Sequence, residues 1–405
     1  MHKGFIGIIV SFVTAISIIF IYKDAQIMLE KTKNKSYVKQ QNVQAKGFDD
    51  GQLIFKINIR EVKQEAYKHI LFAKNITSGT VFNQNNSGVI TNLKGDRGRI
   101  NTNVKSVTIT GNIKANIHPS TADKVVRIES DDFFYNHKKE KAMFRSKNKL
   151  LVDNTELNAE KFTYNNKTEA IHFNSKTILK NKSSTTVFNS GKMDINNSTL
   201  YATDNIKTTY KNNEKSTDYS DQIKELIKKS TTITAEALRL NFKNTDYSAV
   251  TYNQNVDVNQ NDKSLKTDVL SLNFMTEQYI ASGDVTISLD SLKWLKKNDK
   301  KYKNSEIESM LNKSTKIMAN QAQFNAKNNI FTLKKDVIIK QINFKLRADQ
   351  FDFNFSKDKM IAFGNVKVYK FGIEHLQTEQ LIIDLKNETF KSSTSEELSE
   401  ITIEL

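Results

Sequence analysis

The chain has 405 residues, with 61 Lys and Arg against 45 Asp and Glu, a formal net charge of +16, one proline and no cysteine. The lack of cysteine excludes a thiol nucleophile and a disulfide framework. The positive charge favours an anionic partner through long-range attraction. The basic residues are spread evenly and no nucleic-acid-binding module can be read, so we expect no nucleic-acid partner.

The first predicted element is a membrane anchor. Residues 4–22 are apolar apart from Ser11, Thr14 and Ser17, and such a stretch can cross a hydrocarbon core of ~30 Å as a helix. A cleaved signal peptide is the alternative, but no small-residue cleavage site follows the stretch. We therefore expect a leader over 1–3, an uncleaved single-pass anchor over 4–22 and a linker over 23–48. The lysines that follow the anchor run against the positive-inside rule, but long domains translocate largely regardless of charge, so we place residues 23–405 in the periplasm.

From about residue 100 onward, two short phrases recur roughly every thirty residues. One is Gly, then Asn or Asp, then a β-branched residue, as at 283–285 and 364–366. The other is a small residue, an acid and, two positions later, an apolar residue, as at 235–238 and 348–351. A fixed period of this size predicts a stacked architecture. Because the acids recur with the repeat, we interpret them as structural, at a turn or strand start, and not as catalytic; they are Glu160, Glu236, Asp268, Asp349 and Glu379.

Two Lys-, Asn- and Ser-rich insertions interrupt the period, at about 211–230 and about 290–315. In the second, Ser305 and Glu308 have capping-box spacing, and a short helix with one apolar face is predicted over Ile307, Met310 and Leu311. A similar stripe over 223–227 predicts a helix in the first. The insertions are either contacts for a partner or a membrane surface, or solvated excursions without a special task.

The repeats themselves are typical of strands. Phe351, Phe353 and Phe355 alternate with polar residues, and the runs 238–242 and 381–385 do the same. A second run after a polar turn contains Ile361 and Phe363, and its alternation shifts phase across the glycine at 364, where a bulge is expected. The prediction is an all-β protein.

Catalytic chemistry is not indicated. The six histidines lie far apart in sequence, and none has metal-ligand spacing to an acid or to another histidine. No phosphate-binding loop, dinucleotide fingerprint or nucleophile elbow is present. We expect no enzyme activity, metal or cofactor.

In its order of elements the chain resembles the LptC and OstA-like family of lipopolysaccharide export proteins, as an unusually long member. The resemblance lies in the N-terminal anchor, the stretch 50–57 (DGQLIFKI), the run 107–113 (VTITGNI) and the downstream phrases. It implies an elongated β-jellyroll of stacked antiparallel strands, with an LptC-like part over 49–128 and OstA-like repeats over 129–405. It also implies that acyl chains of lipopolysaccharide travel in an apolar groove. The implied partners are lipopolysaccharide, LptF/LptG-like membrane subunits with their ATPase complex, and an LptA-like periplasmic protein.

Two sets of site residues follow from this reading. The lipid-groove candidates are Val107, Ile109, Ile113, Leu238, Leu240, Phe242, Phe351, Phe353, Phe355, Ile361 and Phe363. Edge strands are natural sites of strand addition, and the candidates for pairing with partner proteins are Leu53, Phe55, Ile57, Leu381, Ile383 and Leu385, with 400–405 as a second possibility at the C-terminal end.

A second class of function remains open, namely a membrane-anchored structural or adhesive β-solenoid that binds protein or polysaccharide. The interior separates the two hypotheses. A solenoid closes over a dry core, whereas a lipid bridge has a cleft that can take acyl chains.

Overall fold

The structure is a computed structural model that describes residues 37–65, 69–83, 87–119, 124–152, 155–211, 229–243, 246–295 and 305–393. The predicted anchor, the first insertion from 212 to 228 and the C-terminal stretch 400–405 lie outside these residues. The described residues form two compact units. One comprises the chain up to Ala115 together with Asp132–Glu140, and the other comprises Asn116–Asp131 and everything from Lys141 onward.

The first unit is built from four long strands and parts of two more. Its strands are β1 (Tyr37–Asp49), β2 (Gln52–Glu65), β3 (Ile70–Phe82) and β4 (Gly88–Asn101), and it shares β5 (Ser106–Ile117) and β6 (Val126–Asn136) with the second unit; η1 (His137–Lys139) follows. Residues 37–48 were expected to belong to a linker. They instead pair with β2 along most of its length, so that expectation was wrong for this stretch.

The second unit contains the remaining strands and the one α-helix of the described residues. The first group is β7 (Lys141–Val152), β8 (Thr155–Asn165), β9 (Ala170–Phe173), β10 (Thr177–Lys180), β11 (Ser184–Phe188), β12 (Ser190–Asp194) and β13 (Thr199–Tyr210). The second group is β14 (Thr231–Lys243), β15 (Asp246–Gln260), β16 (Lys263–Asn273), β17 (Gln278–Leu289), η2 (Lys293–Leu295), α3 (Ser305–Asn312), β18 (Thr315–Asn325), β19 (Ile330–Lys340), β20 (Phe344–Asn354), β21 (Lys359–Lys370), β22 (Ile373–Asp384) and β23 (Thr389–Ser393).

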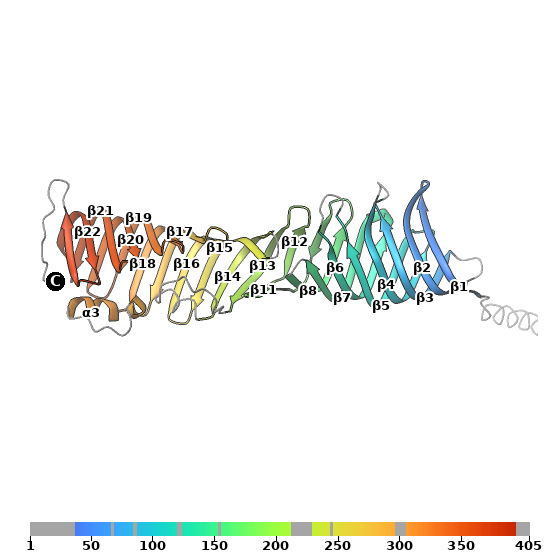
Figure 1. The fold of residues 1–405 in the computed structure, drawn as a ribbon, viewed down its shortest axis with the longest axis horizontal. Coiled ribbons are helices and arrows are strands. Elements are labelled where there is room, and N and C mark those ends of the chain that lie inside the picture. Colours follow the sequence, from blue (N-terminus) through green and yellow to red (C-terminus); the bar gives the residue numbers. More distant parts are fainter. Residues whose placement is uncertain are drawn as a thin grey trace, which may run out of the picture. The chain divides into compact units, whose positions relative to one another are not determined.

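Successive long strands of the second unit pair antiparallel, from β13 through β22 (Figure 1). The predicted all-β class is therefore confirmed, with a long antiparallel, jellyroll-like sheet. Hairpin turns begin with an Asn or Asp whose side chain accepts backbone N–H groups. Asn354 accepts from Lys357 at 3.0 Å, and Asn273 accepts from Thr276 at 3.0 Å. This is the Asx-turn chemistry that makes these residues common in turns.

In the second unit, the first and second halves of a strand belong to two different ladders of paired strands. The first half of β8 pairs with β10, whereas its second half pairs with β9. The two ladders rejoin at β13, which pairs with both β11 and β12. Between β8 and β13 the two halves are separate short strands, and elsewhere one long strand bends to provide both.

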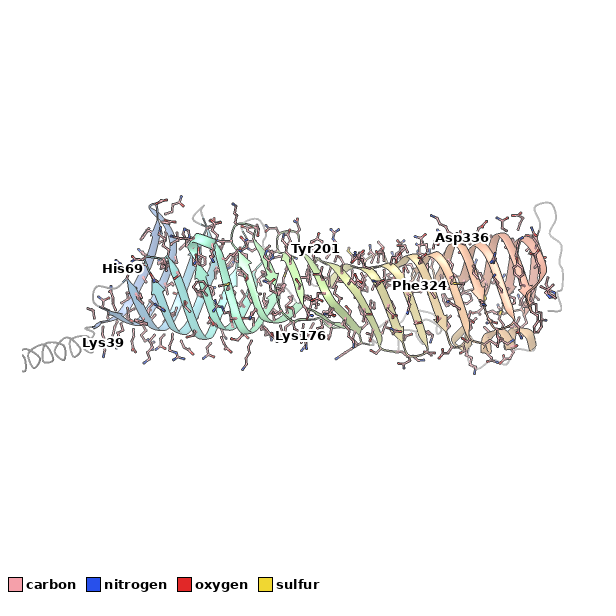
Figure 2. The ribbon with its side chains drawn as sticks, turned by 180° about the vertical axis from the view of Figure 1, so that it is seen from behind. Lys39, His69, Lys176, Tyr201, Phe324 and Asp336 are labelled. Carbon is pink, nitrogen blue, oxygen red and sulfur yellow. The ribbon has the colours of Figure 1, made fainter. Side chains whose placement is uncertain are left out.

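The recurring glycine phrase forms the bend. Two consecutive residues with positive φ lie in the middle of each odd-numbered strand from β13 to β21: Asp204 and Asn205, Gln254 and Asn255, Gly283 and Asp284, Lys335 and Asp336, Gly364 and Asn365. Each pair interrupts the ladder register as a bulge with one extra residue on the odd-numbered strand. Asp336 lies at the outer margin of the ribbon (Figure 2).

The small-acid phrase lies on the neighbouring strand, opposite the bend. Asn365 donates to Asp349 at 2.9 Å, and a Cβ on Gly364 would clash with the same carboxylate. The small residue faces inward, where the Thr267 hydroxyl donates to the Ser282 carbonyl at 2.8 Å. The acids are thus structural, but they lie in mid-strand and not at a turn or strand start as predicted.

Candidate functional site

An apolar cavity of about 350 Å³ lies inside the second unit. Its walls come from β14 to β22, and the side chains that define it include Leu265, Ile287, Ile317, Phe324, Phe331, Leu333, Ile339, Leu346, Phe351, Phe353, Phe355 and Met360. The volume is within the range of small-molecule sites, ~300–1,000 Å³. Such an interior can accept an aliphatic guest but offers little to a polar one.

Both halves of a bent strand point into this one cavity. On β20, Leu346 precedes the bend and Phe353 follows it, and both line the wall. On β19, Leu333 and Ile339 do the same. The bend therefore wraps the two ladders around a shared interior, as in a jellyroll.

The second insertion closes part of this interior. Leu292, Leu295 and Met310 line the cavity, and the Leu292 amide donates to the Leu311 carbonyl at 2.9 Å. Gln341, in the turn after β19, donates to the Met310 carbonyl at 2.8 Å, and Figure 1 shows α3 along this margin of the strands. The predicted helix is confirmed over Ser305–Asn312. The second insertion is therefore not a solvated loop, because the Leu311 side chain of this helix is fully buried.

A second cavity of about 320 Å³ continues toward the C-terminal strands. It shares Met310, Gln341, Phe344 and Ile383 with the first. Its floor is apolar, whereas Ser309, Lys313, Asn343 and Lys370 are polar members of its wall.

The predicted groove residues of β20 and β21 divide between two faces. Phe351, Phe353 and Phe355 line the first cavity, and Phe351 lies opposite Ala362 on β21. Ile361 lies opposite Asp352, and Phe363 lies opposite Gln350. Since opposite residues share a face, Ile361 and Phe363 point away from the cavity, and their expected place in its wall was wrong. The bulge adds its extra residue to β21, and the residues of β21 that face inward keep their alternation across it. On β20 the alternation of the inward residues shifts by one position instead.

The other groove candidates line neither cavity. Leu238, Leu240 and Phe242 are buried in β14 of the second unit. Val107, Ile109 and Ile113 are buried in the first unit, at 0–1% exposure. They are packed core in this structure.

The predicted N-terminal edge is not an edge. Leu53, Phe55 and Ile57 belong to β2, which pairs with β1 on one side and β3 on the other. The outer strand of the described first unit is β1, most of which was assigned to the linker. At the other end, Leu381 and Ile383 pair with β23 and line the second cavity, and Leu385 is buried just beyond β22.

Sequence reasoning missed most of the cavity wall. Leu265, Phe324, Leu333 and Ile339 lie in alternating runs like that of Phe353, so the same signal was present. Leu292 and Leu295 gave no such signal, because they lie in an irregular segment whose contact with the strands is set by tertiary folding.

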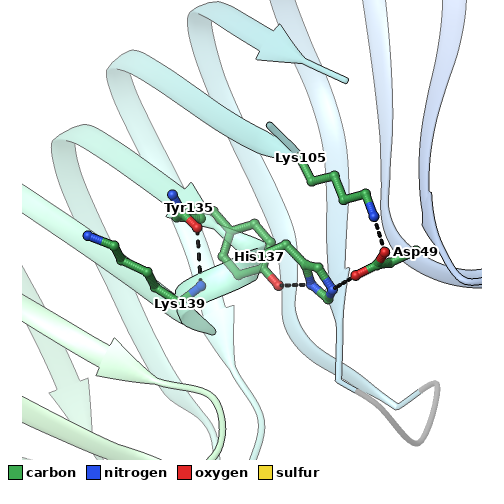
Figure 3. A network of polar contacts seen from close by, with 6 residues as sticks. Asp49, Lys105, Tyr135, His137 and Lys139 are labelled. Carbon is green, nitrogen blue, oxygen red and sulfur yellow. Dashed lines mark hydrogen bonds and ion pairs between the residues drawn. The ribbon is translucent and has the colours of Figure 1, made fainter. Parts of the chain in front are cut away.

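A polar network lies in the first unit (Figure 3). The His137 imidazole contacts Asp49 at 2.8 Å through Nε2, the Tyr135 hydroxyl lies 3.3 Å from its Nδ1, and Lys105 also pairs with Asp49. Burial and the nearby Lys105 charge lower the pKa of His137. The His137 amide also donates to the Lys105 carbonyl at 3.2 Å. The network fastens three turns together across 88 positions of sequence, a contact that sequence spacing could not reveal.

Within the described ranges, no group of three or more His, Asp and Glu side chains could hold a metal ion. No helix among the described residues is long and apolar enough to cross a membrane, and the predicted anchor at 4–22 lies outside them.

Comparison with known proteins gives one family. The family described as "Lipopolysaccharide-assembly, LptC-related" matches residues 7–181. No curated protein matches. Among solved structures, the chain matches the crystal structure of LptH from Pseudomonas aeruginosa, which is described as the LptA homologous periplasmic component of the conserved lipopolysaccharide transport device. The sequence identity is 12% and the TM-score is 0.24, and the match covers 33% of this chain and 82% of that chain. Over residues 7–181 the chain is therefore similar to the LptC-related family of lipopolysaccharide-assembly proteins.

Proposed function

We propose that this protein is a bridge component that accepts lipopolysaccharide at the inner membrane and passes it toward the outer membrane along its apolar interior. The observation that carries the proposal is the cavity lined by Phe351, Phe353 and Phe355. Each buried CH₂ group contributes ~0.8 kcal/mol, so one chain of ~12 carbons gains roughly 10 kcal/mol on entering such an interior. The family match supports lipopolysaccharide as the source of that chain.

In this proposal residues 4–22 anchor the protein in the inner membrane and the rest is periplasmic. The protein itself has no enzymatic step, and the energy comes from an ATPase complex coupled through LptF/LptG-like subunits. An LptA-like protein receives the lipid. Strand addition would use the outer strand β1 and the first half of β22, beside which the described residues place no strand other than β21.

A structural or adhesive role is the second candidate, and one observation favours it. From β7 to β13 the interior is filled, with Phe144, Phe162, Phe173 and Phe188 at 0–1% exposure. A spacer that only holds a partner at a distance needs a filled core of this kind along its whole length.

Photo-crosslinking in cells separates the two. A benzophenone amino acid replaces Phe353, which faces the cavity, or Phe363, its matched control on the outer face of the next strand. We expect a lipopolysaccharide adduct from position 353 and none from position 363. Absence of adduct at both positions, in protein that is folded and membrane-bound, overturns the transport proposal and favours the structural role.

A further inference from the structure

Two neighbouring hairpin tips expose large apolar side chains beside the second cavity. Ile342, in the turn after β19, is 83% exposed, and Phe371, in the turn after β21, is 69% exposed. The tips are joined, since the Phe371 amide donates to the Asn343 carbonyl at 3.0 Å. Ile373 at the start of β22 is 66% exposed. A cluster of exposed apolar residues marks an interaction site.

A row of lysines crosses the strands next to these tips. Lys316 on β18 lies opposite Lys340 on β19, which lies opposite Lys345 on β20. Side chains directly opposite are ~5 Å apart at Cβ, and like charges there destabilise the sheet. Lys46 and Lys56 also lie opposite each other, but they do not form a row of three lysines, because the residue opposite Lys56 on its other side is Thr80. The three-lysine row is thus an unfavourable arrangement for folding alone.

The row opens into a basic depression that adjoins the cavity. The depression is lined by Lys340, Lys345 and Arg347, and no acid is among its lining residues. Lys345 lies over the Tyr369 ring, 5.6 Å from its centroid. Asn343, Phe344 and Phe371 belong both to this depression and to the second cavity.

The polar wall of that cavity is basic as well. Lys313 and Lys370 contribute to it, and again no Asp or Glu does. The second cavity is largely apolar, exposed apolar side chains lie beside it on the hairpin tips, and basic residues lie on both sides of these tips. These features match the acyl chains and the charged headgroup of an anionic amphiphile. The charges are complementary to phosphate, which Lys binds as a point charge.

We propose that the lysine row Lys316–Lys340–Lys345, with Arg347, binds the phosphate-bearing headgroup of a glycolipid whose acyl chains enter the second cavity between the two hairpin tips. The inference rests on the proposed transport function and adds the place where the headgroup is held. The anion would offset the repulsion within the row, and this accounts for three aligned lysines on one face of the sheet.

The test uses the full chain in neutral-detergent micelles, with purified lipopolysaccharide and the same material after enzymatic removal of its phosphates. The double variant K340Q/K345Q removes two charges from the row. The control K46Q/K56Q removes the same two charges from opposite positions of β1 and β2. We expect K340Q/K345Q to weaken binding of phosphorylated lipopolysaccharide about fivefold at low salt, because each exposed ion pair contributes only modestly to affinity. The difference should shrink at high salt, and binding of the dephosphorylated form should not change.

The melting temperature gives a second readout. Removing the repulsion within the row should leave the melting temperature of K340Q/K345Q unchanged or raised. A lowered melting temperature, an equal loss for both lipid forms, or the same loss in the control overturns the headgroup site. Inorganic phosphate that binds as tightly as the lipid also overturns it, because the site would then be a simple anion site.

Failure of the transport proposal is distinguishable from failure of this one. If the parent protein binds neither form of lipopolysaccharide, transport fails, and dodecyl phosphate then tests the site by itself. A loss of dodecyl phosphate affinity in K340Q/K345Q, with dodecyl maltoside unaffected, supports an amphiphile headgroup site. Equal affinities for parent and variant overturn it.

Discussion

Two stretches of the second unit share one repeat but differ inside. From β7 to β13 the inward side chains are packed against one another, as in the stacked pair Phe144 and Phe162, whose ring centroids are 4.6 Å apart. From β16 to β22 the inward rings surround a cavity, and Phe324 and Phe331 stay partly exposed to it. The same strand pattern therefore builds either a filled core or a hollow one.

The difference follows from how the strands are continued and covered. In the filled stretch the chain is interrupted between β9 and β10 and between β11 and β12, so the two ladders can approach each other. Small inward hydroxyls help, and Thr186 and Thr208 bond to each other at 3.0 Å. In the hollow stretch each strand runs through its bend, and η2 and α3 are inserted at the margin. Lipid transfer, if it crosses the filled stretch, requires that this core opens.

The largest expected effect is on stability. Phe162→Ala in the filled stretch should lower the free energy of unfolding by ~3–5 kcal/mol, because it removes a fully packed ring and leaves a void. Phe353→Ala should cost about half as much, since one side of that ring already faces empty space and lacks partner atoms. Thermal or denaturant unfolding of both variants checks this. Equal losses would show that the hollow stretch is closed in solution.

Adding side-chain volume, instead of removing it, also distinguishes the filled stretch from the hollow one. Leu157→Phe adds volume to a site with 0% exposure and should cost ~1–3 kcal/mol through overpacking. Leu265→Phe adds the same volume to the cavity wall and should be neutral or stabilising by up to ~2 kcal/mol, as cavity-filling changes commonly are. It should also reduce lipid binding by occupying the chamber. A stability loss as large for Leu265→Phe as for Leu157→Phe contradicts the cavity.

The smallest effect concerns pH. Hydrogen bonds from Lys263 and then Lys229 lower the pKa of Asp262 to about 2, and Lys263 belongs to the cavity wall. Since the folded pKa lies below the unfolded value of ~3.9, this contribution to stability is complete above about pH 4 and is lost as the pH falls toward 2. The carboxylate is 35% exposed, so screening limits the contribution to under ~1 kcal/mol.

Asp262→Asn should therefore unfold more easily than the parent at pH 7 and equally easily near pH 2. Unfolding curves at the two pH values measure the difference. A gap between parent and variant that persists at pH 2 would assign the effect to something other than this charge.

Much of the fold could be predicted from local patterns. Alternation of period two along Phe351, Phe353 and Phe355 specifies a strand with one apolar face wherever it folds. The capping-box spacing at 305–308 was enough to predict α3. The repeated phrases predicted a regular scaffold, because bends need the same few residues each time. The resemblance to LptC-related proteins could be recognised from the order of the short motifs along the chain.

Tertiary structure decided what the apolar faces enclose. Val107 and Phe353 carry the same signal in sequence, yet one is packed core and the other lines a cavity, because the space between ladders depends on residues far apart in the chain. The phase shift expected on β21 falls on β20 instead, so Ile361 and Phe363 face outward while Met360 and Ala362 face inward. The lysine row is likewise invisible in sequence, where Lys316 and Lys345 are separated by a whole hairpin. Only the ladder register brings their charges together.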